Sequence, residues 1–231
     1  PVHGTAHREF QPLSERNRAA MNASIIIYAC ADEFVETRNR GGVDVPCRDV
    51  KVKKRDLATT AVTAAFIGLA ESAYLRLTLG KRRALLGLRK RPAALAEPLG
   101  NAGPVEGLEG DLLTSLSGDQ DGDPVRAAPV GAVIERLLPM SGDPWGDVIA
   151  GIEEEMLEEG YFQEGERKEV ARFFLGKKLE PDCERMAALQ EQVAPVREML
   201  DDFRRKDGTL YEQLLKDVRQ GIKARQEVDM D

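Results

Sequence analysis

The sequence of 231 residues has few aromatic residues and no long hydrophobic run. Aromatic residues make up only 5% of the chain, so its core must consist mainly of Leu, Val, Ile and Ala, which favours helices. The longest apolar runs, near residues 23–31 and 61–70, are about half the roughly 20 residues that a membrane-spanning helix needs. No segment typical of a secretion signal occurs near the start. We therefore predict a mainly helical, soluble protein with a cytoplasmic location.

Cysteine is also scarce. The three cysteines, Cys30, Cys47 and Cys183, are odd in number and form no CxxC motif. This usage predicts neither a disulfide framework nor a structural zinc site, and it is typical of a reducing cytosol. Cys30 lies within an apolar helical pattern, so we interpret it as a core thiol rather than as a nucleophile.

The chain carries a formal net charge of -7, which opposes broad binding to nucleic acid or to anionic membranes. His3 and His7 lie in a polar terminal segment, where histidines are usually solvated. Asp119, Asp121 and Asp123 resemble the start of a calcium loop. However, a proline stands where that loop needs glycine, and no Glu follows at the twelfth position. We expect no bound metal and no cofactor.

The most informative stretch is residues 56–92, which we interpret as a capped helix followed directly by a β-hairpin. Asp56 is the expected N-cap, and apolar residues follow at helical spacing. Residues 74–79 alternate as a strand, Gly80-Lys81 is the expected turn, and residues 84–88 form the return strand.

A weaker copy of this plan runs from residue 143 to residue 181. A helix begins at Asp143-Pro144, a strand begins at Tyr161-Phe162, and a return strand is expected at 170–175. We therefore predict a mainly α fold with two small β-hairpins, in which a winged-helix-like unit occurs twice. The expected divisions are a flexible arm at 1–21, a first unit at 22–98, a connection with a short helix at 99–129, a second unit at 130–181, and C-terminal helices at 182–231.

Other segments give local predictions. Residues 22–38 are expected to be helical, and residues 43–52 to form an edge strand because of Pro46. Pro195 is expected to split the helical region 182–206 into two pieces. In the last helix, four apolar residues recur at every fourth position and offer a homodimer surface: Leu210, Leu214, Val218 and Ile222.

A DNA-binding winged helix is one interpretation of the repeated unit, but the residues of the two candidate helices oppose binding to DNA. A recognition helix needs donors such as Arg, Lys, Asn or Gln. The first candidate helix is expected to expose Thr59, Thr60, Thr63 and Glu71 instead. The second exposes five glutamates, which phosphates would repel: Glu153, Glu154, Glu155, Glu158 and Glu159.

The first hairpin carries the candidate binding residues. They are six cations around its turn: Lys81, Arg82, Arg83, Arg89, Lys90 and Arg91. One interpretation is a solvated hairpin face, and the other is a site for an anionic partner, such as an acidic protein, a phospholipid surface or a nucleic-acid backbone.

Four segments follow one another in the order LAESAYLRL, LEGDLLTSL, VIERLLPMSGDPW and IEEEMLEEGYF, within roughly residues 57–190. This order of segments resembles the Golgi phosphoprotein 3 family, which has many bacterial members. The resemblance implies a mostly helical fold with peripheral hairpins, and eukaryotic members bind a phosphoinositide and a vesicle coat. The family's lipid pocket uses a Trp before the first long helix and arginines on the later one. Residues 50–55 contain no Trp and residues 148–157 no Arg, so the resemblance does not carry the lipid site over. A tandem winged-helix protein of other ancestry explains the same pattern.

No recognisable nucleophile motif or glycine-rich phosphate loop occurs in the sequence, so we predict no catalytic activity. The leading hypothesis is a non-catalytic interaction module that binds a protein partner or an acidic surface through the basic hairpin. The alternative is a winged-helix DNA-binding regulator.

Overall fold

The structure is a computed structural model that describes residues 20, 22–38, 41–84, 89–100, 104–117, 127–165 and 179–227. Several sequence predictions lie outside this part of the chain. They are the arm with His3 and His7, the calcium-like loop at Asp119–Asp123, and the return strand at 170–175. The described chain is mainly helical with small antiparallel sheets, as the sequence predicts.

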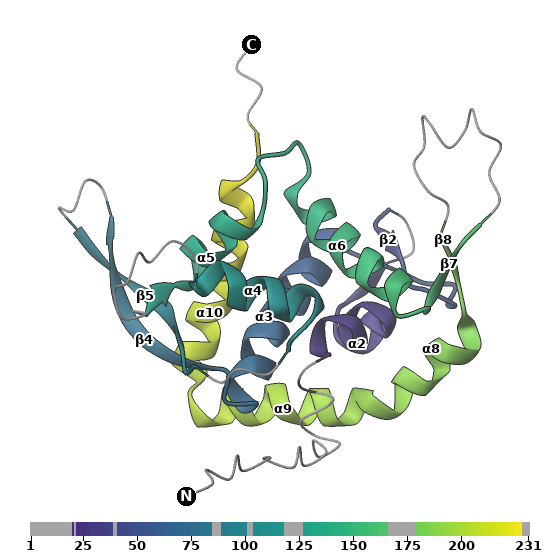
Figure 1. Cartoon of the computed structure of the whole chain (residues 1–231), viewed down its shortest axis with the longest axis horizontal. Coiled ribbons are helices and arrows are strands. Elements are labelled where there is room, and N and C mark those ends of the chain that lie inside the picture. Colours follow the sequence, from purple (N-terminus) through teal and green to yellow (C-terminus); the bar gives the residue numbers. More distant parts are fainter. Residues whose placement is uncertain are drawn as a thin grey trace, which may run out of the picture.

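The long helix α3 (Lys54–Glu71) lies at the centre of the molecule (Figure 1). Twelve of its residues, between Leu57 and Leu69, are buried, so the helix has no wide solvent-facing side. Small side chains let its neighbours approach closely, and the α3 backbone at Gly68 lies against the Ala20 carbonyl. Five helices pack around α3: α2 (Ala23–Ala29), α4 (Gly107–Ser117), α6 (Pro144–Glu158), α9 (Val193–Lys206) and α10 (Gly208–Ala224).

Two predictions about α3 are wrong. The helix begins at Lys54, so Asp56 lies in its first turn, and Lys53 occupies the N-cap position without a side-chain hydrogen bond. Thr59 and Thr63, expected to be exposed, are 1% and 2% exposed. The hydroxyl of Thr59 donates a hydrogen bond to the Arg55 carbonyl at 2.7 Å, and this bond satisfies its polar atom inside the core.

The first hairpin is longer than predicted. Strand β4 (Leu75–Ala84) pairs with β5 (Arg89–Pro98), and β5 also pairs with β6 (Ala128–Pro129). Gly80 and Lys81, the expected turn, lie inside β4 opposite Ala93 and Pro92. A Cβ at Gly80 would come within 2.3 Å of the Leu95 side chain, which would have to shift to admit it. This glycine therefore makes room for a cross-strand neighbour instead of reversing the chain.

The second unit begins as predicted, because Asp143 caps α6 by accepting a hydrogen bond from the Gly146 amide at 3.1 Å. Strand β7 (Phe162–Glu164) follows and pairs with β8 (Leu179–Pro181) over three residues. This short ribbon differs from the ten-residue strands of the first hairpin. A repeated winged-helix-like unit is therefore not confirmed.

The N-terminal segment is shorter and more irregular than one helix over 22–38. Helix α2 ends at Ala29, and a 3-10 turn, η1 (Ala31–Glu33), follows it. Three two-residue strands form a small sheet in the order β1-β3-β2: β1 (Thr37–Arg38), β2 (Val43–Asp44) and β3 (Lys51–Val52). The segment before Pro46 is an edge strand, as predicted, whereas β3 is the central strand.

The C-terminal region is helical. Pro195 lies in the first turn of α9, and the 3-10 turn η2 (Gln190–Gln192) separates α9 from the preceding helix α8 (Cys183–Leu189). Asp207 caps α10, which packs against α5 (Val130–Leu137) and α3. The four apolar residues of α10 proposed as a homodimer surface are buried inside this chain. Leu210 is 5% exposed, and Leu214, Val218 and Ile222 are fully buried. This stripe is therefore part of the core of the folded chain and does not offer a dimer surface.

The expectation that no disulfide forms is wrong. Cys47, in the connection between β2 and β3, is bonded to Cys183 at the start of α8, and their Cα atoms are 5.6 Å apart. Cys30 is the free cysteine and is buried, as predicted for a core thiol. In the part of the chain that the structure describes, no helix is both long and apolar enough to cross a bilayer.

Candidate functional site

The cations of the first hairpin meet across its two strands. The register places Arg82 opposite Arg91, and Arg83 opposite Lys90. Lys81 and Arg91 are exposed and Arg82 is half-buried, whereas the side chains of Arg83, Arg89 and Lys90 lie outside the described part. Like charges at directly opposed positions destabilise a strand pair by up to about 1 kcal/mol. An anion bound beside such a pair would remove this repulsion.

Arg82 connects the hairpin to the last helix. Its Nη2 donates a hydrogen bond to Oε1 of Gln220 on α10 at 3.1 Å. Its Nη1 lies 3.5 Å from the point where a Cβ on Gly131 would stand, so the guanidinium is next to the start of α5. No acidic group lies within ion-pair distance of Lys81, Arg82 or Arg91 among the described residues. Within the described residues, these three cations therefore have no carboxylate partner.

Gln220 also lines a groove of about 450 Å³ on the outer face of α10. Four cations and one carboxylate surround this groove, together with Leu215 and Gln220. The charged residues are Arg55, Lys216, Arg219, Lys223 and Glu212. We call this groove, together with the hairpin residues Arg82 and Arg91, the basic face. Lys81 is next to Arg82 in the same strand, so its side chain points to the other face of the hairpin.

The groove brings together residues that sequence reasoning missed. Lys216, Arg219 and Lys223 recur at helical spacing on the side of α10 opposite its buried stripe. This spacing could have revealed the face. In contrast, the approach of Arg55 from the first turn of α3 depends on the tertiary packing of α3 against α10.

Some of the groove cations have partners and others do not. The Arg55 guanidinium lies 5.3 Å from the centre of the Trp145 ring, a cation–π contact that positions it at the end of the groove. Arg219 Nη2 is 3.8 Å from Oδ1 of Asp56, and Glu212 is 3.6 Å from Arg204, outside the groove. Lys216 and Lys223 form no ion pair with any residue in the described ranges. Their ammonium groups are thus available to an external anion.

The one free thiol is not suited to nucleophilic chemistry. Burial raises the pKa of Cys30 to about 11, since an ionised sulfur would lose its hydration. Nearby Arg48 and the Gln190 amide, whose Nε2 is 2.6 Å from the sulfur, lower the pKa and only partly oppose this effect. At neutral pH Cys30 is therefore a protonated core side chain and not a thiolate.

Comparison with known proteins identifies no relative. The chain matches no family model, no curated protein and no solved structure. The function must therefore be inferred from the chemistry of the basic face and of the cavities in this chain.

Proposed function

We propose that this protein is a non-catalytic interaction module that binds an acidic segment of a protein partner along the basic face. The observation that carries the proposal is the Arg82–Gln220 hydrogen bond, which joins the hairpin and the α10 groove into one continuous cationic surface. A localised cationic surface on a chain with a net charge of -7 selects an anionic partner at one place and repels it elsewhere.

The lining of the groove favours a protein segment over a phosphate-rich surface. Leu215 offers an apolar contact inside the groove, and Glu212 places a carboxylate at its rim. A peptide can direct an apolar side chain to Leu215 and a donor to Glu212. A bilayer or a duplex presents closely spaced phosphates, which Glu212 and the negative net charge repel.

The alternative of a DNA-binding regulator is weakened by the burial of α3. A recognition helix needs an exposed face that can enter the major groove, and α3 is enclosed by five other helices. The resemblance to the Golgi phosphoprotein 3 family remains part of the proposal, and a central buried helix with hairpins at the periphery is compatible with it (Figure 1).

The cellular location is a further part of this proposal. A cytoplasmic location was predicted from the sequence, whereas the Cys47–Cys183 disulfide favours an oxidising compartment. The redox state of this cysteine pair, measured by thiol alkylation in cells before lysis, would decide between the two locations.

The binding proposal is tested with a double charge reversal in the groove, Lys216→Glu together with Lys223→Glu. The binding of a fluorescent peptide of alternating Glu and Leu is measured by anisotropy at several salt concentrations. We expect wild-type binding that weakens as salt rises, because exposed charges are screened, and a loss of binding of at least about tenfold in the variant.

A matched control reverses Arg38 and Arg136, two exposed arginines outside the basic face, and changes the net charge by the same amount. This control should bind the peptide as the wild type does, and both variants should keep the wild-type thermal midpoint. Equal weakening in both double variants would mean that only net charge matters and would overturn the proposal. Tighter binding to vesicles containing anionic phospholipid than to the peptide would overturn the proposal of a protein partner and indicate a membrane surface instead.

A further inference from the structure

Strand β2 and the β7–β8 ribbon lie at the opposite end of the molecule from the first hairpin (Figure 1), and residues of both line a second cavity. Its volume is about 680 Å³, within the range of about 300–1,000 Å³ that small-molecule sites occupy. Segments from distant parts of the chain form its walls: the stretch 42–48, Tyr28 of α2, Glu153 of α6, and three residues of the ribbon. We call this cavity the Tyr28 pocket.

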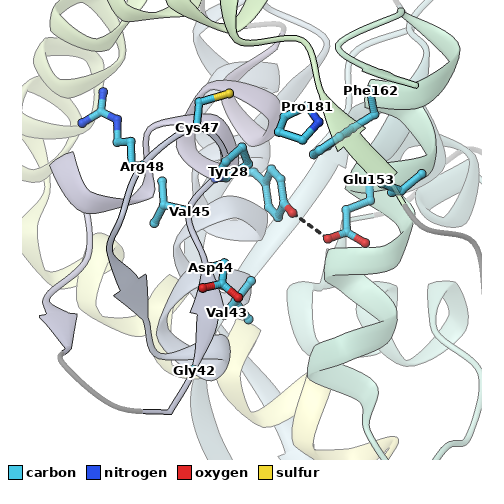
Figure 2. Close-up of a pocket in the computed structure, with 12 residues that line it drawn as sticks. Tyr28, Gly42, Val43, Asp44, Val45, Cys47, Arg48, Glu153, Phe162 and Pro181 are labelled. Carbon is cyan, nitrogen blue, oxygen red and sulfur yellow. Dashed lines mark hydrogen bonds between the residues drawn. The ribbon is translucent and has the colours of Figure 1, made fainter. Parts of the chain in front are cut away.

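The polar centre of the pocket is a phenol bonded to a carboxylate. The Tyr28 hydroxyl donates a hydrogen bond of 2.6 Å to Oε1 of Glu153, and Figure 2 shows the ring directed across the cavity toward that carboxylate. Tyr28 is only 3% exposed. Burial, Glu153 and Asp44 all raise the pKa of Tyr28 above its ordinary value, so its hydroxyl remains a donor. This bond fixes the position of Glu153 and leaves its second oxygen able to accept from a ligand.

The charges around the pocket do not balance. Arg48, the one cation of its lining, points away from the cavity (Figure 2) and is paired with Asp32. Asp44 pairs with Lys51 at 2.6 Å. Glu153 has no ion-pair partner among the described residues. The pocket therefore holds one carboxylate whose charge the described chain does not neutralise.

Apolar and aromatic side chains form part of the walls. The Phe162 ring packs edge-on against the Tyr28 ring, with centroids 6.3 Å apart. Val43, Val45 and Leu179 add aliphatic surface. The Cys47–Cys183 bond ties the 42–48 wall to the segment just after the ribbon wall, which keeps the two walls together before any ligand arrives.

We propose that the Tyr28 pocket binds an organic cation, an ammonium group carried on an apolar body. The ammonium pairs with the free oxygen of Glu153 and lies near the faces of aromatic rings, which attract cations. The apolar body fills the space along Val43, Leu179 and Phe162. The same chemistry is offered by a free amine and by a lysine side chain of a peptide. This site is separate from the basic face, so its test is independent of the proposed acidic partner.

Titration calorimetry with phenethylammonium chloride tests the proposal on the whole, oxidised protein. Its neutral isostere, 2-phenylethanol, has the same ring without the charge. We expect the ammonium to bind at least about tenfold more tightly than the alcohol, and to shift the NMR methyl signals of Val43 and Leu179. Equal affinities, no binding of the ammonium at millimolar concentration, or shifts confined to residues outside the pocket would overturn the proposal.

A variant pair assigns the charge preference to one carboxylate. Glu153→Gln should lose the preference for the ammonium, whereas Glu154→Gln, an exposed neighbour on the same helix that does not line the cavity, should keep it. A preference that survives in Glu153→Gln would contradict the assignment. If Glu153→Gln does not fold, the affinities of the unaltered protein for phenethylammonium and 2-phenylethanol still decide whether the pocket prefers a cation. N-acetyl-lysine methylamide distinguishes the sources: tighter binding of this compound than of phenethylammonium indicates a peptide side chain, and the reverse indicates a free amine.

Discussion

The carboxylate of Asp217 on α10 accepts a hydrogen bond from the backbone amide of Ala94 on β5, at 2.7 Å. Both residues are buried, and Gln213 Nε2 donates to the second oxygen of Asp217 at 3.0 Å. This contact fixes the hairpin to the helix that carries the groove, so the two parts of the basic face keep a constant relative position.

We expect Asp217→Ala to lower the free energy of unfolding by about 1–3 kcal/mol, because it leaves a buried amide without an acceptor. Urea unfolding measures the loss, and amide hydrogen exchange at Ala94 should become faster. Glu198→Ala, on the exposed side of α9, is the control and should change stability by less than about 0.5 kcal/mol. Equal stabilities of the two variants would show that the contact contributes nothing.

Two glycines in helices should respond oppositely to the same substitution. A Cβ at Gly68 of α3 would stand 1.9 Å from the Ala20 carbonyl oxygen, whereas a Cβ at Gly151 of α6 would meet nothing within 4 Å. Gly68→Ala should therefore destabilise the protein by about 1–3 kcal/mol through overpacking. Gly151→Ala should stabilise it by up to about 1 kcal/mol, because alanine favours the helix. Thermal midpoints of the two variants test this difference, and changes of the same sign would contradict it.

Glu109 makes the stability depend on pH. The side chain is fully buried, and its carboxyl accepts hydrogen bonds from the amide and hydroxyl of Ser24, at 3.1 and 2.8 Å. Burial, and then repulsion by Glu155, raise the pKa of Glu109 from 4.5 to about 8. Between these two values the folded state holds a proton that the unfolded state has lost. The contribution of Glu109 to stability is therefore greatest below pH 4.5 and is lost as the pH rises to about 8.

Glu109→Gln should separate this effect from packing, because an amide resembles the protonated acid and cannot ionise. We expect urea midpoints close to wild type at low pH and clearly higher than wild type above the folded-state pKa. Glu135 is an exposed site on α5. The urea midpoint of Glu135→Gln should differ from that of the wild type by the same small amount at low and at high pH. A wild-type profile parallel to that of Glu109→Gln would exclude Glu109 as the source of the pH dependence.

The disulfide should contribute much of the stability. It closes a loop with a sequence separation of 136, for which the chain-entropy model gives about 5 kcal/mol as an upper value. Dithiothreitol should lower the urea midpoint of the wild type. The double variant Cys47→Ser with Cys183→Ser should have this lower midpoint already and should not respond to the reductant. If dithiothreitol left the urea midpoint of the wild type unchanged, the two cysteines would not be bonded in solution.

Local signals predicted much of the helical architecture. The start of α6 followed from Asp143-Pro144, and the break before α9 followed from Pro195, because capping and proline geometry depend on adjacent residues. The buried stripe of α10 also follows from its spacing, although the sequence cannot show whether such a stripe faces its own chain or a second copy. Its partner, α5, lies far away in the sequence.

The errors concern long-range contacts. Thr59 and Thr63 were assigned to an exposed face because they are polar. The Thr59 hydroxyl can be buried because it bonds to its own helix, whereas the buried Thr63 hydroxyl has no hydrogen-bond partner among the described residues. Nothing local brings Cys47 and Cys183 together, since a disulfide depends on the distance between their backbones. The basic hairpin and the helical spacing of the α10 cations were visible in the sequence, whereas the contribution of Arg55 to the groove was not, since Arg55 reaches α10 only through packing.

The Cys47–Cys183 bond also determines how mechanical tension would pass through the molecule. Force applied to the segments outside the two cysteines would travel through the sulfur–sulfur bond, so the chain between them would bear no load. Helix α3 and the β4–β5 hairpin lie within this shielded loop, and α10 lies outside it. Pulling would therefore load α2, α9 and α10 directly, whereas α3 and the hairpin would carry no tension along their own backbone.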